Sequence, residues 1–302
     1  MRINLIGKGY WGNNLARCLS RLHCLGEVID PHVIEAAPNY ETVDWDGVDG
    51  AVIATPPATH KDIALWVLEN TEARVLIEKP MTTSLEEAQA LEPHADRIMV
   101  DHTFLFVPEF QHIRQMLLSD ALGDPLYAYS DRLNLGKFQS CGVVWDLAPH
   151  DLALFQWLFD EPPEVQHAEQ HCIRYEEPDM ARMSIKYGDV HTHLHMSWIH
   201  PTKVRKTTII GTAAMVVYDM LAEEKIKVYY PSAEVSSRTP TESYGEYLMR
   251  YRGGAVVSPA VEQCEPLMAM CAEFRDFIQG GCIRSDYELG RDVVSVLQEV
   301  GD

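Results

Sequence analysis

Two short segments carry side chains that are suited to moving a proton. Lys79 follows an apolar run and precedes Pro80, and Asp146 and His150 stand four residues apart in WDLAPHD. On a helix this spacing places both side chains on one face, where the carboxylate would orient the imidazole and favour its protonated form. Histidine is well matched to proton transfer near neutral pH. A helix-terminal ion pair, and a lysine that only reaches solvent, remain as open alternatives.

A glycine-rich turn near the N-terminus is suited to binding a phosphate. The stretch Gly7-Lys8-Gly9-Tyr10-Trp11-Gly12 has the spacing G-x-G-x-x-G between a predicted strand and a predicted helix. In dinucleotide-binding turns the first glycine makes the turn, the second admits the pyrophosphate and the third allows close helix packing. Asp30 ends the next strand, where a carboxylate binds ribose hydroxyls and repels a 2′-phosphate, which favours NAD over NADP. The alternative is that Asp30 only caps a loop.

The first part of the chain, up to about residue 120, alternates short apolar strands with amphipathic helices. Strands are expected at Arg2–Ile6, Gly26–Asp30, Gly50–Thr55, Arg74–Glu78 and Arg97–Asp101, and helices at Trp11–Leu22, His60–Leu68 and Leu85–Leu91. This alternation predicts a parallel sheet with helices on both faces. Because ligands collect at the carboxyl edge of such a sheet, Thr55, His60 and Lys79 are expected at one cleft.

The second part of the chain has longer strands with alternating polarity. Strands are expected at Tyr127–Asn134, Glu164–Arg174, Ala181–Tyr187, Val190–Trp198, Val204–Ile210 and Met215–Asp219, and helices at Val144–Phe159, Leu267–Ile278 and Arg291–Val300. Gly188-Asp189 predicts a hairpin, and Pro231–Pro259 reads as a long loop or lid. We therefore predict an α/β chain with a Rossmann dinucleotide-binding domain at residues 1–120. An α/β domain with an open, mainly antiparallel sheet is predicted at residues 121–302.

Composition excludes several classes of partner. The chain has 25 Lys and Arg against 45 Asp and Glu, a net charge of −20, and such a surface repels nucleic acids and anionic membranes. The longest stretch without a charged residue or histidine is 12 residues, against the ~20 that a membrane-spanning helix needs. The seven cysteines are scattered without a C-x-x-C pair, and the N-terminus has no cleavable apolar region. We expect a cytoplasmic protein with reduced thiols.

Two features could suggest other chemistry. His191, His193 and His195 alternate along one strand, and neighbours on one strand face lie ~6.6 Å apart, which is too far for two imidazoles to share a metal comfortably. We expect no metal cofactor and interpret the three histidines as a polar sheet face or a subunit contact. Cys141 has no neighbouring base in the sequence and is expected to be an inert thiol.

Several blocks, taken in order, resemble the Gfo/Idh/MocA oxidoreductases. These blocks are GKGYWGNN, ATPPATH, EKP, DHTFLFVPEF, GDPLYAYSDRLNLGKF and WDLAPHDLALF, and MSWIHPTKVRKTTIIG continues the resemblance beyond about residue 160. The resemblance implies a Rossmann domain followed by an α/β domain whose open sheet makes dimer or tetramer contacts. It also implies hydride exchange between NAD and a hydroxyl-bearing or keto carbon of a sugar or cyclitol.

The resemblance also assigns roles to residues. Lys79 matches the lysine that hydrogen-bonds the reacting oxygen, His150 the acid/base and Asp146 the carboxylate beside it. We predict that Arg132 and Asn134 bind substrate together with Lys79 and His150. The predicted cofactor-binding residues are Gly7, Gly9, Tyr10, Trp11, Gly12, Asp30, Thr55, Pro56, His60, Glu78 and Lys79.

The predicted substrate class is a nucleotide-linked sugar, because WDLAPHD, RLNLG and SWIHPTKVR look most like family members that act on such sugars. Lys203 and Arg205 would then serve a diphosphate, or they simply line a sheet face. The alternatives are a cyclitol or free-sugar dehydrogenase and a non-catalytic NAD-binding regulatory protein. In each case the expected partner is a small molecule, with a homodimer or homotetramer formed through the C-terminal sheet.

Overall fold

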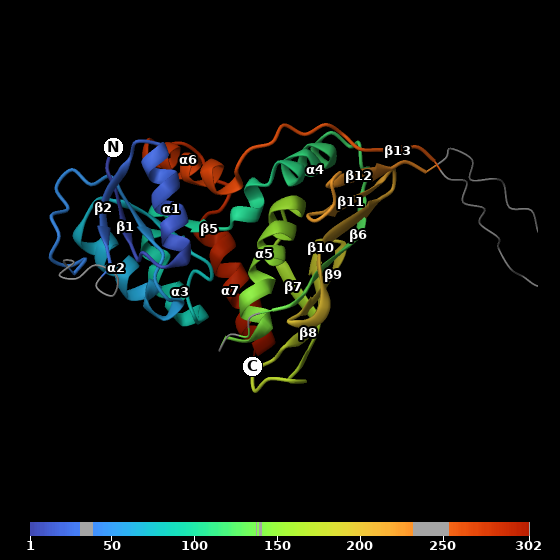
Figure 1. The fold of residues 1–302 in the computed structure, drawn as a ribbon, viewed down its shortest axis with the longest axis horizontal. Helices are drawn as coiled ribbons and strands as arrows, with labels where there is room; N and C mark the ends of the chain where they lie inside the picture. Colours follow the sequence, from blue (N-terminus) through green and yellow to red (C-terminus); the bar gives the residue numbers. More distant parts are fainter. Residues whose placement is uncertain (31–38, 137, 139–140, 232–253, 302) are drawn as a thin grey trace, which may run out of the picture.

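The fold has two β-sheets with helices between them. The structure is a computed structural model, and it describes residues 1–30, 39–136, 138, 141–231 and 254–301. Figure 1 shows the smaller sheet with its helices at one end of the molecule and the larger sheet at the other. Helices α5 (Gly142–Phe159) and α7 (Tyr287–Gly301) lie between them. The predicted α/β class is confirmed.

The first sheet is parallel throughout and has the strand order β2-β1-β3-β4-β5. Its strands are β1 (Ile3–Ile6), β2 (Leu25–Ile29), β3 (Gly50–Ile53), β4 (Arg74–Glu78) and β5 (Ile98–Asp101). Strand side chains alternate between two hydrophobic clusters, for example Leu5 in one and Ile6 in the other. Both faces of the sheet are covered, and this explains why the strands are continuous apolar runs.

Helices on each face complete the two clusters. Helix α1 (Tyr10–Arg21) contributes to one, and α2 (His60–Asn70) and α3 (Leu85–Leu91) contribute to the other. Strand β2 lies on one side of β1, and β3 lies on the opposite side of β1, so the strand order reverses direction at β1. The carboxyl ends of β1 and β3 therefore flank the crevice where doubly wound sheets bind ligands.

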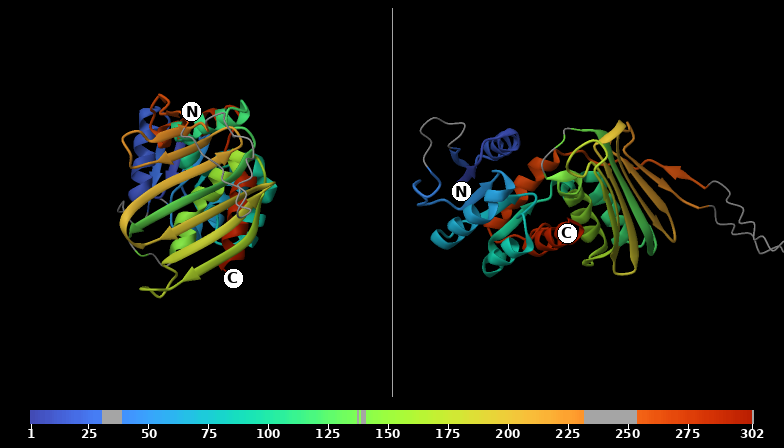
Figure 2. Two further views of the ribbon diagram at one scale, coloured as in Figure 1. Left: turned by 90° about the vertical axis from the view of Figure 1, so that its right-hand side faces the viewer. Right: turned by 90° about the horizontal axis from the view of Figure 1, so that it is seen from below.

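The second sheet has eight strands in the order β13-β12-β11-β10-β6-β9-β8-β7. All neighbours are antiparallel except β6 and β9, which run parallel. The strands are β6 (Pro125–Leu135), β7 (Pro163–His171), β8 (Met180–Tyr187), β9 (Val190–Ser197), β10 (Ile199–Gly211), β11 (Met215–Asp219), β12 (Ile226–Tyr229) and β13 (Val256–Val257). Figure 2 shows that helices cover one face of this sheet and leave the other face open.

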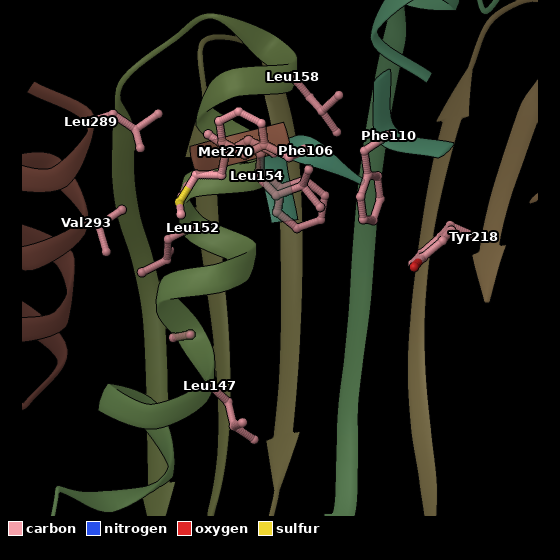
Figure 3. Packing of buried hydrophobic residues seen from close by; sticks show 14 of the residues in the cluster. Phe106, Phe110, Leu147, Leu152, Leu154, Leu158, Tyr218, Met270, Leu289 and Val293 are labelled. Carbon is pink, nitrogen blue, oxygen red and sulfur yellow. The ribbon is translucent and has the colours of Figure 1, made fainter. Parts of the chain in front are cut away.

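Helix α5 covers the second sheet with an apolar face. Figure 3 shows its leucines pointing toward the strands and neighbouring helices, where they meet aromatic rings. The labelled residues are Leu147, Leu152, Leu154 and Leu158 of α5, with Phe106, Phe110, Tyr218, Met270, Leu289 and Val293 around them. The mainly apolar composition of α5 is explained by this burial on several sides.

The last two helices pack beside the first sheet as well as the second. Helix α6 (Pro266–Ile278) packs against α1, and α7 contacts α3, α5 and β5. Between these helices the Val100 amide donates to the Ser285 carbonyl at 2.9 Å, so the returning chain covers the outer edge of β5. The division at residue 120 stays a prediction, and the chain beyond it contacts both sheets.

Some elements differ from the sequence expectation. Helix α4 (Pro108–Leu118), the 3-10 turns η1 (Pro57–Thr59), η2 (Glu92–Arg97) and η3 (Thr103–Phe106), and strand β12 were not expected. The loop expected at Pro231–Pro259 is wrong at Val256–Val257, which pair with β12, and residues 232–253 lie outside the described residues. The predicted hairpin is confirmed, with Gly188 at φ +56°. In the described part of the chain, no helix is long and apolar enough to cross a bilayer.

Candidate active site

The glycine turn after β1 is shaped by the backbone around it. Gly7 has φ +97°, and a Cβ there would lie 2.5 Å from the Ala54 carbonyl oxygen. A Cβ on Gly12 would lie 2.2 Å from the Gly7 carbonyl oxygen. These two glycines are therefore needed for the turn itself and for close packing of α1.

Gly9 is different, because a Cβ there would meet no atom within 4 Å. It is the N-terminal cap of α1, and in the described part of the chain no side-chain hydrogen bond caps that helix. Open space above unpartnered amides at a helix N-terminus is what a pyrophosphate requires. The turn therefore fits the pyrophosphate of NAD, with Gly9 as the position where the backbone can be approached.

Asp30 holds the glycine turn to the end of β2. The Lys8 amide donates to Asp30 Oδ2 at 2.6 Å, and Asp30 is buried. The predicted contact between Asp30 and the ribose hydroxyls stays a prediction, and residues 31–38 beside it lie outside the described residues.

His60 joins the ends of two neighbouring strands. Its Nε2 lies 2.9 Å from the Thr55 carbonyl oxygen and its Nδ1 lies 3.0 Å from the Pro80 carbonyl oxygen. The side chain is buried, and burial lowers the pKa of His60. Thr55, Pro56 and Lys79 are thus brought to one edge of the sheet, as predicted from the strand ends. His60 acts on this edge by holding backbone, and a direct contact with the cofactor stays a prediction.

Lys79 reaches from the end of β4 to helix α5. Its Nζ donates to the Asp146 carbonyl oxygen at 3.0 Å and lies 3.7 Å from Asp146 Oδ1. The side chains of Lys79 and Asp146 are 20% and 21% exposed, so both stay open to a ligand. Pro149 lies inside α5 and has no N–H to donate to the carbonyl one turn earlier. The helix is locally weakened in the turn where the neighbouring Asp146 carbonyl accepts from Lys79.

The expected pairing between Asp146 and His150 is wrong. Asp146 Oδ2 instead accepts a hydrogen bond from Trp198 Nε1 at 3.2 Å, and its other oxygen faces Lys79. His150 Nδ1 is buried and has no hydrogen-bond partner among the described residues. The His150 ring lies 4.9 Å from that of Phe104. The i, i+4 spacing placed both groups in one site but did not make them partners.

The expected protonation of His150 is also wrong. Burial lowers its pKa well below 6.5, and the positive charges of Lys79 and Arg132 lower it further. His150 is therefore neutral at pH 7 and able to accept a proton.

Arg132 and Asn134, predicted to bind substrate, are largely held by protein groups. Arg132 is buried, and its Nε and Nη2 donate to the two Asp151 oxygens at 2.6 and 2.8 Å. Asn134 Oδ1 accepts from Arg205 Nη2 at 2.5 Å. Direct substrate contacts stay a prediction. Among the described residues, Arg132 Nη1 and the Asn134 amide nitrogen make no hydrogen bond and could donate to a substrate.

His102, one residue after β5, was missed by the sequence analysis. Its Nδ1 lies 2.9 Å from Ser285 Oγ, and burial together with the Lys79 charge lowers its pKa to about 3. The signal was present as a histidine after the apolar run IMV, at the same sheet edge as Lys79. The residues around His150 therefore include a second neutral imidazole.

The three strand histidines lie away from this site. In β9 they alternate with buried Thr192 and Leu194, so they share the open face of the second sheet, as predicted. His193 Nδ1 lies 3.0 Å from Ser184 Oγ, and His195 Nδ1 lies 3.2 Å from Asp131 Oδ1. Among the described residues, no group of three or more His, Cys, Asp or Glu side chains is arranged to hold a metal.

Two other sequence features can now be placed. Lys203 is exposed on β10, whereas Arg205 is partly buried and donates to the Leu133 carbonyl at 3.0 Å. Burial raises the pKa of the Cys141 thiol, as does the nearby Asp146 charge. This agrees with the expectation of an inert thiol, because the thiolate is the reactive form.

Comparisons with known proteins decide the family. Residues 1–100 match the family model described as an oxidoreductase family with an NAD-binding Rossmann fold, and residues 110–217 match the Gfo/Idh/MocA C-terminal domain. The chain belongs to the Gfo/Idh/MocA family. Its N-terminal part is thus an NAD-binding Rossmann domain, and the predicted resemblance is confirmed.

Individual relatives fall into two substrate groups. Inositol 2-dehydrogenase 4 of Saccharopolyspora erythraea is 29% identical over 53% of this chain and 54% of its own length. The UDP-N-acetylglucosamine 3-dehydrogenase of Acidithiobacillus ferrooxidans is 30% identical over 63% of this chain and 65% of its own. The chain thus matches less than two thirds of either relative. A solved structure of the latter enzyme has a TM-score of 0.81 at 24% identity, covering 99% of this chain and 96% of that one, which shows the shared fold.

Replacing Gly9 with Ala separates cofactor binding from folding. Because a Cβ at Gly9 would meet no atom of the described residues within 4 Å, we expect unchanged thermal unfolding. NADH affinity, measured by fluorescence titration, should fall at least about tenfold, since a hydrogen bond to a charged group contributes about 1.5–3 kcal/mol. Gly12→Ala is the contrasting variant and should lower thermal stability as well, because its Cβ would meet the Gly7 carbonyl oxygen. Wild-type NADH affinity in Gly9→Ala would contradict this assignment.

The protonation of His150 can be measured directly. NMR titration of the imidazole nitrogens, assigned with His150→Gln, should show a pKa well below 6.5. The free energy of unfolding should decrease as the pH falls below 6.5. In that range the His150 imidazole binds a proton in the unfolded chain but not in the folded protein. Lys79→Met should raise this pKa by removing a neighbouring charge. A His150 that titrates at or above 6.5 would refute the interpretation.

Proposed function

We propose that this protein is an NAD(H)-dependent oxidoreductase that moves a hydride between the nicotinamide and a hydroxyl-bearing ring carbon of a sugar. The observation that supports this is the meeting of Lys79 and Asp146, with His150 one turn further along α5. This group lies at the sheet edge that also carries the glycine turn of an NAD-binding domain. An ammonium and a neutral imidazole are the groups that carbinol oxidation requires.

In the proposed mechanism the chain handles the proton and the charge on oxygen. NAD supplies the hydride acceptor when it is bound. His150 accepts the hydroxyl proton, which its neutral state allows. Lys79 stabilises the negative charge that develops on the substrate oxygen, and Asp146 keeps the ammonium in place from α5. In the reverse direction His150 returns the proton.

The proposal prefers NAD to NADP because of Asp30. Asp30 directly follows β2, and its carboxylate is the acidic group at the position where the ribose of a dinucleotide lies in such folds. A negative charge there disfavours a 2′-phosphate. Its hydrogen bond from the Lys8 amide holds it beside the glycine turn.

For the substrate we propose a nucleotide-linked sugar. The support is the UDP-N-acetylglucosamine 3-dehydrogenase, which is similar in sequence and shares the fold over nearly the whole chain. Arg132 and Arg205 lie near the site and supply positive charge on an otherwise acidic chain. A cyclitol is the second candidate, supported by the similarity to inositol 2-dehydrogenases.

We further propose that copies of the chain associate through the open face of the second sheet and that the protein works in the cytoplasm. Tyr127 and Tyr129 are large side chains exposed on the open face of β6, where they alternate with the buried Ala128 and Ser130. A second copy would cover them. The proposed compartment is supported by the free state of all seven cysteines, which suits a reducing environment.

The substrate class can be tested by ligand-dependent stability. UDP-N-acetylglucosamine at about 100 times its Kd should stabilise the NADH-bound protein by about 2.7 kcal/mol in thermal unfolding, whereas myo-inositol should leave it unchanged. UDP alone and N-acetylglucosamine alone are the controls for partial recognition. Reduction of NAD⁺, followed by absorbance, should accompany the stabilising sugar. Stabilisation and turnover by the cyclitol alone would decide for the second candidate.

Lys79 is tested with the sugar that is turned over. Lys79→Ala should lower kcat about 10²- to 10³-fold, the usual effect of removing one group that stabilises an oxyanion. The Kd for NADH should stay within about threefold. Lys227→Ala, which removes a surface lysine on β12, is the control and should retain full activity. Unchanged turnover in Lys79→Ala would remove Lys79 from the mechanism.

A further inference from the structure

A pair of buried acidic residues lies at the edge of the first sheet. Glu78 is the last residue of β4 and Asp101 the last residue of β5, and the two are paired in register. Residues paired across adjacent strands point to the same face of a sheet. Asp101 is only 2% exposed, and Glu78 is partly buried beside it. Neither the predicted catalytic group nor the proposed mechanism uses Asp101.

Asp101 links three segments of the site. Its Oδ2 accepts from Trp11 Nε1 at 3.0 Å, and its Oδ1 accepts from Thr103 Oγ1 at 2.5 Å. Trp11 is in the first turn of α1, directly after the glycine turn. Glu78 directly precedes Lys79. Asp101 therefore lies where the cofactor-binding turn meets the strand that carries the catalytic lysine.

The two carboxyl groups of Glu78 and Asp101 carry more negative charge, when both are ionised, than the facing groups carry positive charge. The facing groups are Lys79 from the end of β4 and the Cys271 thiol from α6, with Trp11 from α1 as a neutral donor. Lys79 is the one cation among them, and it is also engaged by Asp146. Burial and the neighbouring Asp101 charge raise the pKa of Glu78, and burial raises that of Asp101. Two adjacent desolvated carboxyl groups do not both ionise readily.

We propose that Glu78 and Asp101 hold one proton between them, and that Asp101 is thereby a positioning residue that keeps Trp11 and the glycine turn in place relative to Lys79. The proposal rests on the proposed function only in treating this edge as the cofactor site. The proton itself belongs to the free protein and does not depend on turnover.

The shared proton has two consequences for pH dependence. A carboxyl group whose pKa is raised by folding contributes stability that is lost as the pH rises through that value. Loss of the proton also adds a negative charge next to the turn that fits the pyrophosphate, so NADH affinity should fall over the same pH range. These two changes should occur together.

Asp101→Asn is the test variant. Asparagine keeps an oxygen that accepts from Trp11 and an N–H that donates to Glu78, but it carries no charge. Glu78 is then ionised at neutral pH, and the site has the same net charge as the wild type with its shared proton. Asp189→Asn, at the exposed hairpin between β8 and β9, is the matched control.

Urea unfolding and NADH titration from about pH 5 to pH 9 give the readouts. In the wild type and in Asp189→Asn we expect NADH affinity to fall about tenfold as the pH rises, the effect of one pKa unit. In Asp101→Asn we expect less than a threefold change, and a stability relative to wild type that increases with pH. Equal pH slopes in Asp101→Asn and wild type, for stability and for binding, would overturn the proposal.

A second variant keeps the proposal testable if Asp101→Asn does not fold. Glu78→Gln is then judged by the same pH slope of stability, because it also removes one of the two carboxyl groups. A protein that binds NADH but oxidises no sugar would refute the proposed function while leaving the shared proton supported by its pH slopes. A normal sugar oxidation with equal pH slopes would do the reverse.

Discussion

The contact between Lys79 and Asp146 is the interaction on which the geometry of the site depends. Lys79 extends from the end of a strand in the first sheet, and Asp146 lies on the helix that covers the second sheet. The ammonium is held by a backbone carbonyl at 3.0 Å and faces a carboxylate at 3.7 Å. This contact joins α5 to the sheet edge, and His150 lies one turn further along the same helix. The proposed catalytic group, assembled from two layers, requires such a fixed point.

The local charge of the site is opposite to that of the whole chain. The net charge is −20, yet Lys79, Arg132 and Arg205 surround His150. Asp151 balances Arg132 through two hydrogen bonds, which makes a buried guanidinium tolerable. Burial, together with the remaining positive charge, keeps the imidazole neutral, and that charge suits an anionic group on a ligand. The net charge of the chain therefore disfavours polyanionic partners, but it does not describe the charge at the site.

Helix α5 combines two tasks that demand different residues. Its leucines fill the core beside the second sheet. Asp146 meets Lys79 from the first sheet, and His150 follows one turn later. Pro149 between Asp146 and His150 removes one rung of the helix. The residues of α5 before and after Pro149 are well buried, and this packing keeps the helix intact although one backbone hydrogen bond is missing. Rigid packing around a small polar region is what proton transfer at fixed distances needs.

Local sequence patterns determined the strands, the glycine turn and the sheet edge that gathers Lys79, because apolar periodicity and positive φ act over a few residues. They also placed Asp146 and His150 on one helix. Only the tertiary structure decided their partners: Trp198 and Lys79 take the oxygens of Asp146, and the raised and lowered pKa values come from groups distant in the sequence. The sequence pattern also did not predict the pairing of β13 with β12 or the packing of α7 against the first sheet. Spacing along a chain limits which residues can meet, but desolvation and competing donors decide which ones do.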